Sequence, residues 1–228
     1  MTWALVPAAG SGRRFGGEVP KQYQQAAGKP LIAHTLAALL AHPGIDGVVV
    51  ALAAGDSCWP GWTTLHGKPV VTCIGGGERA DSVLAALRAL PAVVADDELL
   101  LVHDAARPNL HADDVDRLID AANACEDGAI LAAPLRDTLK RTDAGLRIAE
   151  THSRAGLWRA LTPQAFRRDL LRRALEAAKA DGVVVTDEAM AVERLGLHPR
   201  LVEGREDNLK VTTPADLALA EFLLARHV

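Results

Sequence analysis

The chain has 228 residues, of which 49% are hydrophobic and 24% charged, and its formal net charge is -4 at pH 7. These proportions are typical of soluble globular proteins and exclude the fibrous and intrinsically disordered classes. A chain of this length can bury about 70% of the surface that it exposes when unfolded, so it needs neither disulfides nor a structural metal to hold a core.

The cysteines and the overall charge narrow the class further. Cys58, Cys73 and Cys125 are odd in number, widely spaced and never in a CxxC pair, which argues against a disulfide framework or a zinc site. We expect a cytoplasmic protein, because the first residues carry no basic lead and no apolar run approaches the ~18 residues of a membrane span. We expect no nucleic-acid partner either, because the chain is slightly acidic and only 4% aromatic.

Short apolar runs alternate with longer stretches of helical spacing. The runs predict buried strands at residues 5–8, 48–51, 70–74, 99–102, 129–133 and 183–185. The longer stretches predict helices at residues 32–40, 80–90, 113–125, 168–180 and 215–226. This alternation predicts an α/β fold with a single Rossmann-like, mostly parallel sheet and helices on both faces, in one domain over residues 1–228.

Two local signals add detail. Thr213 is a good N-cap for the last helix, and Pro214 follows at the first helical position. Residues 56–64 are rich in Gly, Trp and Pro, and they predict an irregular loop with one short helix.

Residues 136–154 interrupt the alternation, because they are charged and carry weak strand patterns at 138–141 and 146–151 around a turn at 142–145. This pattern predicts a protruding β-hairpin arm. An isolated two-stranded hairpin is marginally stable in water, so the arm should rest on its own domain or on a second copy of the chain. We therefore predict a homodimer.

Polar residues gather where the predicted strands end. In an open α/β sheet, ligands bind beyond the carboxyl ends of the strands. The first strand is followed by Gly10 and Gly12 and by the cations Arg14 and Lys21, and the fourth strand is followed by Asp104. Glycines let backbone N–H groups approach an anion, and the two cations add charge, so this region predicts a polyphosphate site.

Two common phosphate-binding motifs do not fit this loop. Walker A requires Lys and Ser or Thr after its last glycine, but Gly17 is followed by Glu18. The dinucleotide motif GxGxxG fails because Phe15 stands at the third glycine position. A P-loop NTPase and a dehydrogenase are therefore disfavoured. The remaining features, with Asp104 and the distant Lys210, fit a nucleoside triphosphate, a divalent metal and a phosphorylated second substrate.

Seven motifs in a fixed order carry a resemblance to a known family. They are PAAGSGRR at 7–14, PKQY at 20–23, GGERADS at 76–82, VHDAARP at 102–108, TPQ at 162–164, TDEA at 186–189 and NLKVT at 208–212. With these motifs the chain resembles the 2-C-methyl-D-erythritol 4-phosphate cytidylyltransferases over nearly its whole length. The family often has an acidic residue where this chain has Gly77, so a side-chain contact near the cytosine is either lost there or replaced by backbone or water.

The resemblance implies the transfer of CMP from CTP to 2-C-methyl-D-erythritol 4-phosphate, with Mg²⁺ or another divalent cation, in the non-mevalonate isoprenoid pathway. It implies catalytic roles for Arg14, Lys21, Arg154 and Lys210, and magnesium binding by Asp104. It implies nucleotide contacts from Ala8, Ala9, Gly10, Gly12, Arg14, Lys21, Gly76, Ser82 and Ala105. It implies substrate contacts from Asp104, Arg107, Thr138, Arg154, Thr186 and Lys210, with Thr138 and Arg154 reaching the partner subunit on the arm.

Two alternatives remain open at this point. A cytidylyltransferase for another polyol phosphate, such as ribitol 5-phosphate, would share the architecture. A non-catalytic nucleotide-binding or assembly subunit would not need to keep Arg14, Lys21, Asp104 and Lys210 together. We also expect Lys21→Ala and Asp104→Ala to abolish turnover and leave the fold intact, because both residues should lie on exposed loops at strand ends.

Overall fold

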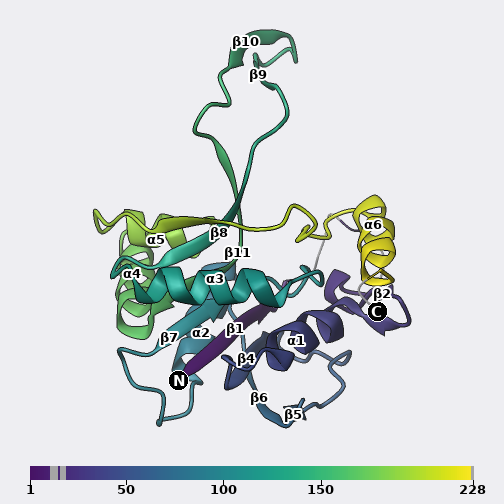
Figure 1. Cartoon of the computed structure of the whole chain (residues 1–228), viewed down its shortest axis with the longest axis vertical. Helices are drawn as coiled ribbons and strands as arrows, with labels where there is room; N and C mark the ends of the chain where they lie inside the picture. The colour runs from purple at the N-terminus through teal and green to yellow at the C-terminus, as the bar shows by residue number, and fades with distance from the viewer. Residues whose placement is uncertain (11–14, 16–18, 227–228) are drawn as a thin grey trace.

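A mixed β-sheet runs through the body of the molecule (Figure 1). The computed structural model describes residues 1–10, 15 and 19–226, so the predicted site residues Gly12 and Arg14 lie outside the described part. In spatial order the strands are β12 (Arg200–Glu203), β8 (Ala129–Pro134), β11 (Trp158–Arg167), β7 (Leu99–Val102), β1 (Thr2–Ala8), β4 (Gly47–Leu52), β6 (Lys68–Ile74) and β5 (Thr64–Leu65).

Most of this sheet is parallel, as the sequence predicted. The strands β7, β1, β4 and β6 run parallel to one another, and β12 runs parallel to β8. The strand β11 is antiparallel to both of its neighbours, β7 and β8, and the short β5 is antiparallel to β6. The α/β fold with a mostly parallel sheet is therefore confirmed, with β11 as an antiparallel insertion in its middle.

The strand predicted at residues 183–185 is wrong. These residues form a loop, in which the N–H of Val183 donates to the carbonyl of Ala178 (2.9 Å) and so closes the preceding helix. Val184 is 68% exposed, which is incompatible with a buried strand. The strands β11 and β12, which lie on either side of β8, were not predicted from the sequence.

Helices cover both faces of the sheet. The helices α1 (Leu31–Ala41) and α3 (Ala112–Asn123) share one hydrophobic core with the sheet, and α2 (Arg79–Arg88), α4 (Arg168–Ala180) and α5 (Glu188–Glu193) share the other. The alternation along β4 shows why: Val48 and Val50 belong to the first core, and Val49 and Ala51 belong to the second. The five predicted helices are all present; the helix at 168–180 has the predicted ends, and the ends of the other four are shifted by one or two residues.

The last helix, α6 (Pro214–Leu224), lies at one side of the sheet beside the small hairpin of β2 (Gln25–Ala26) and β3 (Lys29–Pro30). Its predicted start is confirmed, because the Thr213 side chain accepts from the N–H of Asp216 and the Asp216 carboxylate accepts from the N–H of Thr213. The segment before it runs back to the sheet, where the N–H of Val211 donates to the carbonyl of Ala106 (2.9 Å). This contact brings the residues just before α6 to the end of β7.

The predicted hairpin arm is present. It consists of β9 (Leu139–Thr142) and β10 (Ile148–His152), which pair with each other and project far from the body (Figure 1). Asp143 shapes the turn, because its Oδ1 accepts from the N–H groups of Gly145 (2.8 Å) and Arg147 (3.0 Å). Two apolar side chains of the arm, Leu146 and Ile148, are 85% and 65% exposed.

The loop at residues 56–64 differs from its prediction, because it contains no helix. Trp59 and Trp62 instead stack edge to face with their ring centroids 5.3 Å apart. The loop is tied to the body by Tyr23, whose hydroxyl donates to the Asp56 carboxylate (2.8 Å). Burial and this carboxylate raise the pKa of Tyr23, so the phenol stays protonated.

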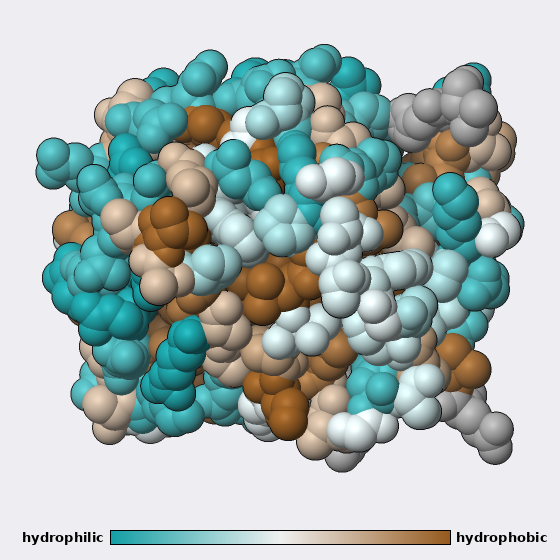
Figure 2. Space-filling model, turned by 90° about the horizontal axis from the view of Figure 1, so that it is seen from below, coloured by the Kyte–Doolittle hydropathy of each residue, from teal (hydrophilic) through white to brown (hydrophobic). Residues whose placement is uncertain are grey.

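The end of the body opposite the arm is bordered by hydrophilic residues, with apolar residues gathered near the middle of the view (Figure 2). Apolar surface is therefore not confined to the arm. Across the described ranges, no helix combines the length and the apolar character needed to cross a membrane.

Candidate active site

A cavity of about 380 Å³ lies at the carboxyl ends of β1 and β7, where ligands of open α/β sheets bind. Its size is typical of small-molecule sites. It brings together nine of the predicted site residues: Ala8, Ala9, Gly10, Lys21, Gly76, Ser82, Asp104, Ala105 and Lys210. It is also lined by Pro7, Phe15, Gln22, Gly77, Glu78, Arg79, Ala106 and Thr212. The sequence analysis gave none of these last eight residues a role at the site.

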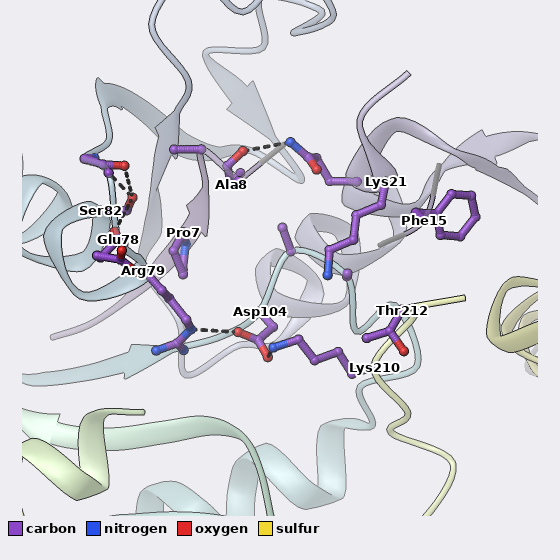
Figure 3. A pocket seen from close by; sticks show the side chains of 17 residues that line it. Pro7, Ala8, Phe15, Lys21, Glu78, Arg79, Ser82, Asp104, Lys210 and Thr212 are labelled. Atoms are coloured by element: carbon purple, nitrogen blue, oxygen red, sulfur yellow. Dashed lines mark hydrogen bonds and ion pairs between the residues drawn. The ribbon is translucent and has the colours of Figure 1, made fainter. Parts of the chain in front are cut away.

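Lys21 reaches the cavity because its short 3-10 helix, η1 (Lys21–Tyr23), is fixed against the end of β1. The Gln22 side chain, which is buried, donates from Nε2 to the carbonyl of Ala8 (2.8 Å). The Lys21 ammonium then points into the same space as the ammonium of Lys210 and the guanidinium of Arg79 (Figure 3). Three cationic side chains therefore face one cavity.

The second Gly-rich turn, at residues 75–77, forms another wall of the cavity and requires glycine at positions 75 and 76. A Cβ at Gly75 would lie 2.6 Å from the Cβ of Ala9 and 2.7 Å from Oγ of Ser82, which is closer than such atoms can approach. The Ser82 hydroxyl accepts from the N–H of Gly76 (3.2 Å) and so holds the turn against the start of α2. A Cβ at Gly77 would meet nothing within 4 Å, so this position has room for a side chain.

Asp104 lies at the centre of the charged groups. Its Oδ1 contacts Nε of Arg79 (3.0 Å), and its Oδ2 contacts Nζ of Lys210 (2.9 Å) and Nε of Arg107 (3.3 Å). Burial alone would raise the pKa of Asp104, but Arg79, Lys210 and Arg107 outweigh it and hold that pKa well below its usual range. Asp104 is therefore a carboxylate at neutral pH.

Two of these cations, Arg79 and Arg107, each have a second partner besides Asp104. Nη1 of Arg79 contacts Oε1 of Glu188 (2.5 Å), and Nη1 of Arg107 donates to the carbonyl of Asn208 (2.7 Å). Burial would lower the pKa of Arg79, but the carboxylates of Glu188 and Asp104 raise it, so Arg79 stays charged. Burial raises the pKa of Glu188, and the contact with Arg79 opposes that rise.

His103, which precedes Asp104, is fully buried and takes no part in lining the cavity. Its Nε2 lies 3.0 Å from the carbonyl of Arg107, and its Nδ1 lies 2.9 Å from Oγ1 of Thr162. The same Oγ1 accepts from the N–H of Asp104 (3.0 Å). Burial lowers the pKa of His103 to about 4, so a neutral imidazole helps to place the Asp104 backbone.

Four predicted site residues of the described chain do not line the cavity. Arg107 lies behind Asp104 and is buried. Thr186 is exposed before α5, where its N–H and hydroxyl contact Sδ of Met190. Thr138 and Arg154 belong to the arm segment and are exposed, away from this cavity.

The expectation that Asp104 lies on an exposed loop is wrong, because only 7% of the residue is exposed. Arg79 and Glu188 were not predicted from the sequence as site residues. Arg79 carried a signal, because it lies two residues after the Gly-rich turn that ends at Gly77, where a cation can meet a ligand. Glu188 carried none, because an acidic residue in a first helical turn is ordinary.

The comparisons with known proteins agree with this geometry. The family model described as IspD, 2-C-methyl-D-erythritol 4-phosphate cytidylyltransferase, matches residues 2–226. A curated protein of that name from Xanthomonas campestris pv. campestris (strain 8004) is 64% identical over 225 residues, which cover 99% of this chain and 85% of that protein.

Two solved structures with the same name are similar along their whole length. The protein from Francisella tularensis is 31% identical with a TM-score of 0.84, and the match covers 97% of this chain and 99% of the other. The protein from Thermus thermophilus is 34% identical with a TM-score of 0.78, and the match covers 98% of each chain. The chain belongs to the 2-C-methyl-D-erythritol 4-phosphate cytidylyltransferase family.

Proposed function

We propose that the protein transfers CMP from CTP to 2-C-methyl-D-erythritol 4-phosphate and releases pyrophosphate, a step of the non-mevalonate isoprenoid pathway. The product is 4-diphosphocytidyl-2-C-methyl-D-erythritol. The observation that carries the proposal is that Lys21, Arg79 and Lys210 line one cavity with the Asp104 carboxylate. The Gly-rich turn at residues 75–77 forms a wall of this cavity, and the chain belongs to this family.

The reaction requires charge stabilisation more than proton transfer. A phosphate oxygen of the second substrate attacks the α-phosphorus in line, the bond to the β-phosphate oxygen breaks, and pyrophosphate leaves with the electron pair. Negative charge then grows on the α-phosphoryl oxygens and on the leaving group, where Lys21 and Lys210 would lie. A phosphate nucleophile is already ionised at neutral pH, so no side chain needs to act as a general base.

The glycine-rich wall is the proposed nucleotide site. Ala8, Ala9 and Gly10, at and after the end of β1, line the cavity together with Gly76 and Ser82. Ala105 lies beside Asp104 on the loop after β7. Gly12 and Arg14, which the resemblance assigns to the triphosphate, stay in the proposal as residues outside the described part of the chain.

The second substrate would bind beside Asp104 and Lys210, which open onto the cavity. Arg107 would support it by holding Asp104, since it contacts that carboxylate from the buried side. Thr186 is the remaining proposed contact from the same chain.

The residues at the cavity fit a magnesium ion that enters with the nucleotide. No group of three or more His, Cys, Asp or Glu side chains in the described ranges could hold a metal by itself. Magnesium at nucleotide sites is commonly bound by one or two carboxylates, with water and phosphate oxygens as the other ligands, and Asp104 supplies such a carboxylate. Bound there, the ion would neutralise triphosphate charge; Lys210 would have to release Oδ2 of Asp104 to admit it.

We further propose a homodimer in which the arm of one copy places Thr138 and Arg154 in the site of the other. The support is the exposure of four apolar side chains in and beside the arm: Leu146, Ile148, Leu157 and Trp158 are 85%, 65%, 42% and 39% exposed. A projecting two-stranded hairpin needs a surface to pack on, and a second copy supplies one. Each copy would consist of one domain over residues 1–228. The three cysteines of the chain are free, which suits a cytoplasmic location.

The test is pyrophosphate release by the purified protein with CTP and magnesium. We expect release with 2-C-methyl-D-erythritol 4-phosphate, and none with ribitol 5-phosphate or when ATP, GTP or UTP replaces CTP. Release with ribitol 5-phosphate alone would overturn the substrate, and no release with any pair would favour a nucleotide-binding subunit without catalysis.

A further inference from the structure

Both oxygens of Asp104 are held by cations that differ in how firmly they are fixed. Arg79 is anchored by Glu188, and Arg107 is anchored by the carbonyl of Asn208. The ammonium of Lys210, by contrast, has no second partner among the residues that the structure describes, and its side chain is 37% exposed. Lys210 can therefore leave the carboxylate while the two arginines stay.

The carboxylate of Glu188 is placed where helix formation does not need it. Asp187 already caps α5, because its side chain accepts from the N–H of Met190 (3.0 Å). Glu188 instead turns inward and is only 1% exposed. It joins the start of α5 to the start of α2, through Arg79, and so to the end of β7 at Asp104.

The pair of Glu188 and Arg79 is not arranged for stability alone. Oε2 of Glu188 and Nη2 of Arg79 are buried, and neither has a hydrogen-bond partner within the described ranges. Buried polar atoms are nearly always paired, and a buried ion pair often stabilises a fold no better than apolar residues would. Arg79 lines the cavity and contacts the Asp104 carboxylate, so the position of this pair points to a role at the site.

The segment that carries Glu188 is itself fixed to the sheet. Gln164, at the middle of the sheet on β11, is fully buried. It donates from Nε2 to Asp187 (2.8 Å), and its Oε1 accepts from the N–H of Ala189 (2.9 Å). These two bonds flank Glu188 in the sequence, so its carboxylate has a rigid base from which to hold Arg79.

We propose that Glu188 is a positioning residue that holds Arg79 on Oδ1 of Asp104, so that only Oδ2 is offered to the ligand when Lys210 moves away. Without Glu188, the Arg79 guanidinium is no longer held on Oδ1 of Asp104, and the Asp104 carboxylate can rotate. This inference rests on the proposed function, because it concerns the same carboxylate and the same reaction.

The kinetic test compares Glu188→Gln, Arg79→Gln and the double variant with Asp181→Asn, a control that removes an exposed carboxylate paired with Arg194. We expect Glu188→Gln to lower kcat about 10-fold or more, the usual effect of losing a group that orients a ligand-binding residue. The KM for CTP should change less than about twofold, because the nucleotide wall is untouched. The double variant should match Arg79→Gln, because Glu188 acts through Arg79.

Three results would overturn the inference: a wild-type kcat in Glu188→Gln, a double variant whose loss is the product of the two single losses, or a loss that only follows the fraction of folded protein. Thermal unfolding of each variant measures that fraction. If the wild-type protein releases no pyrophosphate, the proposed function fails and a structural readout decides the positioning role. In a crystal structure of Glu188→Gln, Arg79 should have left Oδ1 of Asp104, and an unchanged contact would refute the role.

Discussion

Replacing Asp104 by Asn should lower the stability of the fold as well as the activity. The Asp104 carboxylate neutralises the positive charge of three side chains, Arg79, Arg107 and Lys210. Arg79 keeps its contact with Glu188 after the change, and Lys210 is exposed enough to reach solvent. Arg107 has neither option, because its side chain is 9% exposed and its remaining partner is a carbonyl. Removing one member of a buried ion pair costs about 3 to 5 kcal/mol. We take the lower figure, about 3 kcal/mol, because one cation of the three carries the cost.

Urea unfolding followed by circular dichroism measures this loss. With a slope of about 1 to 3 kcal/mol per molar urea, a loss of ~3 kcal/mol lowers the midpoint by about 1 M or more. The matched control is Glu206→Gln, which removes a carboxylate from an exposed ion pair with Arg136 and should leave the midpoint unchanged. Equal midpoints for Asp104→Asn and Glu206→Gln would refute the view that the buried cations depend on Asp104.

Four further changes test other parts of the structure. Lys21→Ala should reduce pyrophosphate release at least about 100-fold without moving the thermal midpoint, since Lys21 faces the cavity; appreciable turnover would remove it from the mechanism. Gly77→Asp should fold with an unchanged midpoint because its Cβ meets open space, and a fall of several degrees would contradict that geometry. Burial lowers the pKa of His103 to about 4, so as the pH falls this histidine is protonated in the unfolded chain before it is protonated in the folded one. Its contribution to stability is therefore complete above about pH 6.5 and falls by about 3 kcal/mol towards pH 4. Urea midpoints at pH 7.5 and 5 should therefore differ more in the wild type than in His103→Gln, and equal differences would speak against this origin. Ile148→Asp should shift the protein from dimer to monomer in sedimentation velocity, and a dimer that persists would show that the exposed arm does not hold it together.

The sequence predicted most helices and parallel strands correctly. The two main errors, at residues 183–185 and at β11, each have a physical reason. The run at 183–185 has the composition of a strand, but it forms the loop between α4 and α5 and pairs with no strand of the sheet. The strand β11 was missed because Pro163 and the polar residues beside it are untypical of a central strand. Pro163 is tolerated because it lies in the register shift between Ala160 and Gln164, where no ladder pairing is needed.

The site residues that lie at the ends of strands were predictable from the sequence. Those whose role depends on contacts with residues far away in the sequence were not. Ala8, Gly76 and Asp104 each follow or end a strand, so the topology of the sheet places them together. The burial of Asp104 could not be foreseen, because its cations come from positions 79, 107 and 210. Glu188 was invisible for the same reason, since its importance lies in a partner 109 residues away in the sequence.

The contact between Lys210 and Asp104 affects both the binding of the substrate and the release of the product. Under the proposed function, an incoming phosphate must displace the Asp104 carboxylate from Lys210, so binding exchanges one anion for another. The carboxylate then acts as a built-in competitor, and part of the attraction between ammonium and phosphate is offset by the contact that is lost. When the product departs, the internal contact re-forms at 2.9 Å, and the ammonium is not left without a counter-ion. Such an exchange limits affinity for the product and favours turnover over retention.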